Sequence, residues 1–193
     1  GGLVGYLWSS NISNSYSKGN ISGNDSIGGL VGNSLSSKIL NSYSTGNVNG
    51  INYVGGLFGD GFSSSKILNS YSTGNVNGTF YMGGLAGRIS SSTYISNSYW
   101  NNHSGNPDNC YPNGNTGCVA IQNNITYFQG DVYPNRGPFA NWSFFSVWQE
   151  RCGDFPVLTW QQIGSNITGN SCELWCAGAD INHDGTVDAA DYV

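Results

Sequence analysis

One pattern returns four times in the first half of the chain, and it restricts the fold more than any other feature. Each copy contains Gly-Gly-Leu, a glycine two residues later, an isoleucine and then Asn-Ser-Tyr. The copies start at Gly1, Gly28, Gly55 and Gly83, at spacings of 27, 27 and 28 residues. A fixed period of this length is typical of repeat architectures, in which each copy packs on its neighbours.

The residues of each copy favour strands and turns over helices. Glycine in a helix interior is less favourable than alanine by about 1 kcal/mol, and the copies also contain many Ser, Asn and β-branched residues. Short runs alternate, with Ile39, Asn41 and Tyr43 on one side and Leu40, Ser42 and Ser44 on the other. We therefore predict an all-β fold, a β-solenoid of about four 27-residue coils with three short strands and three turns in each.

In a solenoid, equivalent residues of successive coils lie about 4.8 Å apart and form columns. The pattern predicts buried columns of Leu and Ile, a stack of Tyr rings and a ladder of Asn side chains joined by hydrogen bonds. The members are Leu3, Leu30, Leu57 and Leu85; Ile12, Ile39, Ile67 and Ile95; Tyr16, Tyr43, Tyr71 and Tyr99; and Asn14, Asn41, Asn69 and Asn97.

The polar surface of the chain contains few charges. Charged residues make up 9% of the 193 residues and the formal net charge is −5, which argues against a nucleic-acid partner because such proteins need a basic surface. No stretch approaches the roughly 20 apolar residues of a membrane span. The chain opens inside one motif and stops inside another, so we interpret it as a piece of a longer polypeptide.

The run "GGLVG…ILNSYSTGNVNG" resembles the GLUG repeat, over about residues 1–106. This resemblance implies a large secreted or surface-bound protein of the adhesin-like kind, or the non-catalytic part of an IgA-specific metallopeptidase.

Aromatic residues gather after the repeats, where we expect a β-rich cap over residues 107–163. A solenoid end exposes strand edges and an apolar cross-section, so it needs a cover. We interpret these aromatic side chains as the core of the cap, and a carbohydrate-binding platform is the alternative. They are Tyr127, Phe128, Phe139, Trp142, Phe144, Phe145, Trp148, Phe155 and Trp160.

The cysteines and sequons indicate an extracellular or cell-surface location. Cys110 and Cys118 flank a turn-rich loop and are expected to form a disulfide, while two of Cys152, Cys172 and Cys176 could form a second. Free structural thiols are the alternative, and the spacing does not favour a metal site. The candidate glycosylation sites are Asn11, Asn20, Asn24, Asn77, Asn102, Asn124, Asn141 and Asn166.

A linker over residues 164–179 is expected to lead to a calcium-binding loop at residues 180–193. The run "DINHDGTVDAAD" has the spacing of an EF-hand loop. Its predicted calcium ligands are Asp180, Asn182, Asp184, Thr186 through its carbonyl, Asp188 and Asp191. With Asp191 closing the loop, the segment resembles the first half of a type I dockerin, which implies a cohesin partner.

The sequence contains no evident catalytic constellation. Only Asp25 and Asp60 carry carboxylates within the repeats, and the two histidines give little basis for a triad. We expect a non-enzymatic structural or adhesive protein: a stalk, an adhesin or a fibre whose copies associate head to tail. The alternative is a dockerin-bearing module that binds cohesin or an extracellular carbohydrate.

Overall fold

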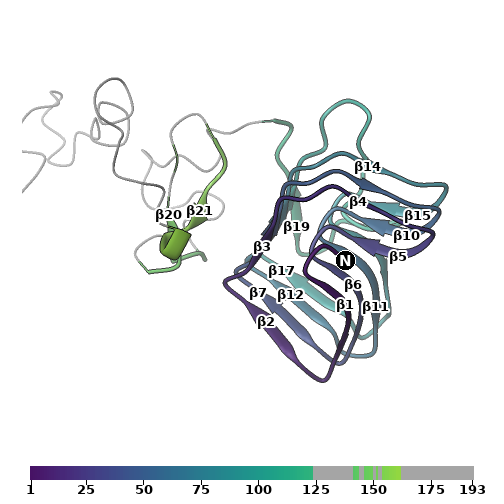
Figure 1. Cartoon of the computed structure of the whole chain (residues 1–193), viewed down its shortest axis with the longest axis horizontal. Helices are drawn as coiled ribbons and strands as arrows, with labels where there is room; N and C mark the ends of the chain where they lie inside the picture. The colour runs from purple at the N-terminus through teal and green to yellow at the C-terminus, as the bar shows by residue number, and fades with distance from the viewer. Residues whose placement is uncertain (124–140, 144–145, 150, 152–153, 162–193) are drawn as a thin grey trace, which may run out of the picture. The chain divides into compact units, whose positions relative to one another are not determined.

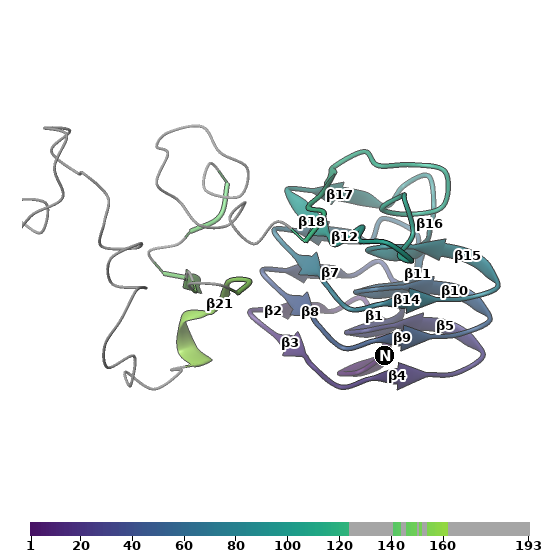
Figure 2. The same cartoon turned by 90° about the horizontal axis from the view of Figure 1, so that it is seen from above.

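The computed structural model describes residues 1–123, 141–143, 146–149, 151 and 154–161. The chain divides into two units, Gly1–Asn124 and Ile125–Val193. The first unit is a β-solenoid in which each strand pairs in parallel with its counterpart one coil further on (Figures 1 and 2). The predicted solenoid is therefore confirmed.

The strands form five parallel rows that run through the stack of coils. The first row contains β1 (Val4–Trp8), β6 (Val31–Leu35), β11 (Phe58–Phe62) and β16 (Ala86–Ile89). The second contains β2 (Asn11–Ser13), β7 (Lys38–Leu40), β12 (Lys66–Leu68) and β17 (Tyr94–Ser96). The third contains β3 (Tyr16–Ser17), β8 (Tyr43–Ser44), β13 (Tyr71–Ser72), β18 (Ser98–Trp100) and β19 (Cys118–Ala120). The fourth contains β4 (Ile21–Ser22), β9 (Val48–Asn49) and β14 (Val76–Asn77), and the fifth contains β5 (Asp25–Gly28), β10 (Asn52–Gly55) and β15 (Phe80–Gly83).

Each full coil has five strands rather than the three expected from the sequence, and residues with positive φ angles mark two of the breaks. In the second coil Ser36 (φ 52°) lies between β6 and β7 and Asn41 (φ 49°) lies between β7 and β8, whereas Tyr53 (φ 52°) lies inside β10. The turn at Asn41 also alters the predicted alternation. Ser42 and Ser44 are fully buried, as Tyr43 nearly is, instead of lying on the opposite side from it.

The predicted columns of Ile and Leu fill the interior. Ile12, Ile39, Ile67 and Ile95 are in register, and each is at most 8% exposed. The leucines of the second, third and fourth copies are fully buried, whereas Leu3 at the N-terminal end of the stack is 52% exposed. Burial of these apolar side chains is the main favourable term for this fold.

The predicted Asn ladder and Tyr stack are also present. The amide of Asn41 donates to Asn14, that of Asn69 to Asn41 and that of Asn97 to Asn69, at 3.1, 3.2 and 3.4 Å. The Tyr43 ring stacks on Tyr16 at 5.3 Å and on Tyr71 at 4.9 Å.

The Gly-Gly-Leu motif is explained by close approach of backbone to backbone. A Cβ on Gly29 would lie 2.2 Å from the Gly56 carbonyl oxygen and 2.1 Å from the Ser44 hydroxyl oxygen. A Cβ on Gly28 would lie 2.5 Å from the Gly59 amide nitrogen. Real Cβ atoms do not tolerate such distances, so only glycine fits at these positions in the stack.

Residues after the fourth copy cover the C-terminal end of the solenoid. The Cys110 carbonyl accepts hydrogen bonds from the amides of Leu85 and Ala86, both at 2.9 Å, and β19 pairs with β18. The Asn106 side chain accepts from the Val76 amide at 2.8 Å, at the edge of β14. These residues belong to the first unit, which continues to Asn124.

The described part of the second unit is a small β hairpin with an aromatic core. Strands β20 (Trp148–Gln149) and β21 (Val157–Leu158) are antiparallel, and the 3-10 helix η3 (Thr159–Gln161) follows them. The Trp142 and Trp148 rings stack at 4.4 Å and are 4% and 0% exposed. These two residues support the core interpretation of the aromatic segment, whereas Trp160 is 57% exposed.

Candidate functional site

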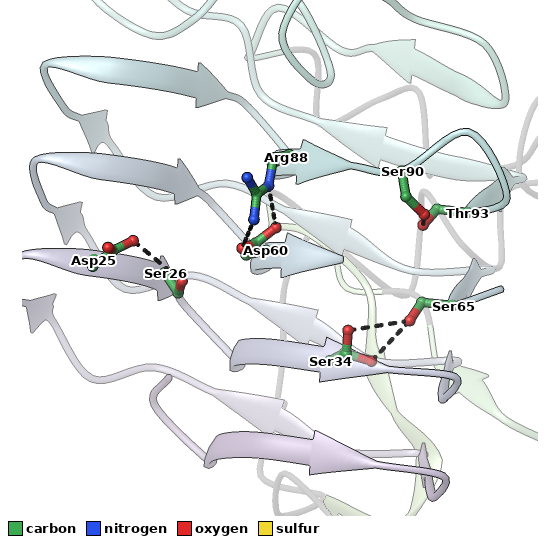
Figure 3. Close-up of polar contacts among 8 residues, drawn as sticks. All are labelled: Asp25, Ser26, Ser34, Asp60, Ser65, Arg88, Ser90 and Thr93. Carbon is green, nitrogen blue, oxygen red and sulfur yellow. Dashed lines mark hydrogen bonds and ion pairs between the residues drawn. The ribbon is translucent and has the colours of Figure 1, made fainter. Parts of the chain in front are cut away.

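An ion pair links the last two strands of the first row. Asp60 on β11 and Arg88 on β16 are in register, and the guanidinium donates from Nε to Oδ1 at 2.7 Å and from Nη2 to Oδ2 at 2.5 Å (Figure 3). The guanidinium also lies 3.9 Å from the centre of the Tyr53 ring and 4.4 Å from that of Phe62. Such bidentate pairing and ring contacts hold an arginine in one orientation.

Burial and the charge of Arg88 act in opposite directions on the pKa of Asp60. The residue is only 1% exposed, and this burial raises the pKa of its carboxyl above the usual range, although the hydrogen bonds and charge of Arg88 pull that pKa down. Nearby Asp25 adds a smaller upward effect. The hydrogen bond to Asp60 raises the pKa of Arg88, whose side chain stays 33% exposed. The two hydrogen bonds set the charge of the Asp60 carboxylate directly against that of the Arg88 guanidinium.

A shallow groove of about 510 Å³ lies beside this ion pair at the C-terminal end of the solenoid. Arg88 lines it from the solenoid side, and the groove is otherwise lined by uncharged residues. Those with aromatic or hydrogen-bonding side chains include Tyr81, Ser91, Tyr111, Asn113 and Thr116. The groove thus combines aromatic rings with many hydrogen-bonding groups and one charge-compensated cation.

Two loops hold the polar wall of the groove. Ser90 and Thr93 share a hydrogen bond of 3.1 Å between their hydroxyl groups, in the turn that follows β16 (Figure 3). On the other side, the Thr116 amide donates to the Tyr111 hydroxyl at 3.2 Å, inside the loop closed by the Cys110–Cys118 disulfide. The predicted pairing of these two cysteines is confirmed, and Cys152, Cys172 and Cys176 lie outside the described residues.

The sequons within the described residues all lie at or near the surface. Asn11, Asn20, Asn24, Asn77 and Asn141 are exposed and Asn102 is partly exposed, while Asn124 and Asn166 lie outside the described residues. Some of these side chains form hydrogen bonds to a neighbouring coil: the Asn77 amide donates to Asn49 at 3.1 Å, and the Asn20 side chain accepts from the backbone amide of Asn47 at 2.9 Å. The exposed sequons therefore differ in whether their side chains take part in hydrogen bonds between coils.

The predicted calcium ligands, Asp180 to Asp191, lie outside the described residues. Within the described ranges, no group of three or more His, Cys, Asp or Glu side chains could hold a metal ion. In the same ranges, no helix has the length and apolar character to cross a membrane.

The Asp60–Arg88 pair was not predicted from the sequence, although a signal for it was present. Each residue lies five positions after the start of its Gly-Gly-Leu copy, at Gly55 and Gly83. Aligning the copies would therefore have placed opposite charges in adjacent coils, where cross-strand partners meet.

Comparison with known protein families gives a match to the GLUG motif, over residues 1–22 and 23–49. Together these ranges cover the first coil and most of the second, and they agree with the resemblance found in the sequence. No curated protein and no solved structure matches the chain.

Proposed function

We propose that this chain is a rigid, non-enzymatic structural or adhesive segment of an extracellular protein. The observation that carries the proposal is the unbroken column of equivalent residues from coil to coil, with parallel backbone pairing in every row. Because each coil is hydrogen-bonded to the next along its perimeter, length can be added without adding a new type of contact. The GLUG match over the first two coils supports the same class.

The disulfide and the exposed sequons support an extracellular location. Cys110 and Cys118 form a disulfide at the C-terminal end of the solenoid, and disulfides persist mainly in oxidising compartments. The exposed sequons Asn11 and Asn24 are the best candidates for glycosylation, since no hydrogen bond within the described chain holds their side chains. An attached sugar at either position would leave the stack intact.

The charges of the solenoid support a non-enzymatic role. Asp60 is buried and paired with Arg88, so it contributes to the stack instead of offering a free acid or base. Asp25 accepts a hydrogen bond from Ser26 on the exterior. Neither carboxylate faces a second one across a cleft, as acid–base hydrolysis of a glycosidic bond requires.

A stalk or adhesin is favoured over a self-assembling fibre. Head-to-tail growth needs open strand edges at both ends, and the C-terminal edges of β14, β16 and β18 are occupied by Asn106, Cys110 and β19. Calcium binding by residues 180–191, and with it a dockerin-like attachment to a cohesin, stays part of the proposal because the acidic spacing supports it.

Labelling of intact cells that express the full-length protein tests this proposal. An antibody against the second coil should bind unpermeabilised cells, and deletion of the gene should reduce their attachment to surfaces or to other cells. Mass spectrometry of the native protein should find Cys110 and Cys118 oxidised. A cytoplasmic location with both thiols reduced would contradict the proposal.

A further inference from the structure

The groove beside Arg88 has the dimensions and lining of a small-molecule site. Its volume of about 510 Å³ falls within the roughly 300–1,000 Å³ of typical ligand pockets. Aromatic side chains with a few placed polar groups are the usual lining of such sites, and here Tyr81 and Tyr111 supply the rings.

The Tyr81 ring is exposed yet held in place. It is 57% exposed, and it stacks on the Tyr53 ring at 5.1 Å. Tyr53 in turn faces the Arg88 guanidinium at 3.9 Å, which Asp60 fixes through two hydrogen bonds. A large apolar ring supported in this way can bind a flat apolar face at a small entropic cost, because little freedom is left to lose.

The charge balance of the groove selects an uncharged ligand. Arg88 is the charged residue among those lining it, and Asp60 compensates that charge. Two guanidinium nitrogens donate to Asp60, whereas Nη1 points away from the carboxylate and stays available as a donor (Figure 3). Hydroxyl and amide groups of Ser91, Asn113 and Thr116 add donors and acceptors around it.

We propose that this groove binds a neutral oligosaccharide. A sugar ring presents an apolar C–H face, which fits the Tyr81 ring, and a rim of hydroxyls, which fits Arg88 Nη1, Asn113 and Thr116. The choice of an extracellular glycan rests on the proposed adhesive function, but the site itself rests on the geometry of the groove. An acidic sugar would bring a charge that finds no net partner here, and a peptide strand would not need the hydroxyl-rich wall.

Saturation-transfer NMR with the whole 193-residue chain tests the proposal. The probes are a panel of neutral oligosaccharides, a panel of acidic oligosaccharides and a set of uncharged extended peptides, each at millimolar concentration. We expect transfer to one or more neutral oligosaccharides, a loss of affinity of tenfold or more in Tyr81→Ala, and a smaller loss in Asn113→Ala.

The matched control is Tyr6→Ala. Tyr6 is 56% exposed on β1, three coils from the groove, so its removal deletes an equally exposed ring and should leave binding unchanged. Circular dichroism should show that all three variants keep the wild-type spectrum.

Several outcomes would overturn the inference. These are binding of the acidic panel or of the peptides alone, equal losses in Tyr81→Ala and Tyr6→Ala, or no binding by any neutral oligosaccharide. None of them affects the cell-surface labelling that tests the structural role, so the two proposals can fail separately.

Discussion

The Cys110 carbonyl occupies the place that the Leu85 carbonyl has one coil earlier. Leu85 accepts hydrogen bonds from the amides of Leu57 and Phe58, and Cys110 accepts them from Leu85 and Ala86. Cys118 then pairs opposite Ser98, as the next Asn-Ser-Tyr copy would. Cys110 and Cys118, which the disulfide joins, have a sequence separation of 8. They take the places of Leu85 and Ser98, which are 13 residues apart in the fourth copy. The cap is a shortened fifth coil.

Removing this disulfide should destabilise the C-terminal end of the solenoid. For the double variant Cys110→Ser/Cys118→Ser, loop-closure entropy predicts a loss of roughly 2–3 kcal/mol in the free energy of unfolding. Urea titration followed by fluorescence measures it. Adding a reductant to the variant is the control, because any further loss reports on Cys152, Cys172 and Cys176. An unchanged midpoint in the double variant would show that the cap is held by its hydrogen bonds alone.

Asn41 has two roles that substitution can separate. It adopts φ 49° and it joins the ladder to Asn14 and Asn69. Asn41→Ala loses the ladder bonds and strains the backbone, whereas Asn41→Gly loses only the ladder bonds. We expect Asn41→Ala to be the less stable by about 1 kcal/mol in thermal or urea unfolding.

Asn49 provides the reversed control. Its side chain accepts a ladder bond from Asn77 at 3.1 Å, but it lies in strand β9 without a positive φ angle. Asn49→Gly should be less stable than Asn49→Ala, because glycine adds backbone freedom to the unfolded chain. The same order of stability at positions 41 and 49 would disprove the turn role of Asn41.

The columns could be predicted from the sequence because they follow from the period alone. Residues such as Ile39 and Ile67 occupy the same position of successive copies, so stacking of the coils brings them together whatever path the chain follows within a coil. The path itself could not be predicted. An asparagine such as Asn41 is compatible with both a strand and a left-handed turn, and reading it as strand merged β7 and β8 into a single predicted strand. The site was harder to predict, since Tyr81 and Tyr111 come from different elements, and Tyr111 lies beyond the repeats.

The glycine pair of each copy should be intolerant of even one methyl group. Gly29→Ala would place a Cβ against the Gly56 carbonyl oxygen and the Ser44 hydroxyl, and both lie in the buried stack, so the coils must separate. We expect a loss of roughly 3 kcal/mol or more in stability, measured by thermal unfolding and by the yield of folded protein. Gly19→Ala is the control, since nothing lies within 4 Å of its added Cβ. Equal stability of the two variants would refute the close-approach explanation.

Calcium should bind to the C-terminal acidic loop. Titration of the whole chain by calorimetry should detect one site, because the spacing from Asp180 to Asp191 supplies the oxygen ligands of one calcium ion. Asp184→Ala should abolish the heat of binding. Asp108→Ala, an exposed carboxylate between the fourth copy and Cys110, should leave it unchanged. Binding that survives in Asp184→Ala would place the calcium site outside this loop, and a wild-type chain without any heat of binding would contradict the prediction.

Acidification should stabilise the wild-type protein relative to Asp60→Asn. Burial raises the pKa of Asp60 in the folded state above its value in the unfolded chain. The Asp60 carboxylate of the folded state therefore becomes protonated at a higher pH than that of the unfolded state. Across the range between the two pKa values, the folded state binds more protons, and stability from this group is gained as the pH falls and lost as it rises. Asparagine does not titrate, so the difference in unfolding free energy between the two proteins isolates Asp60. Urea unfolding from pH 7 to pH 4 should move this difference in favour of the wild type. A shift in the opposite direction would mean that Arg88 outweighs burial and holds the pKa of Asp60 below its ordinary value.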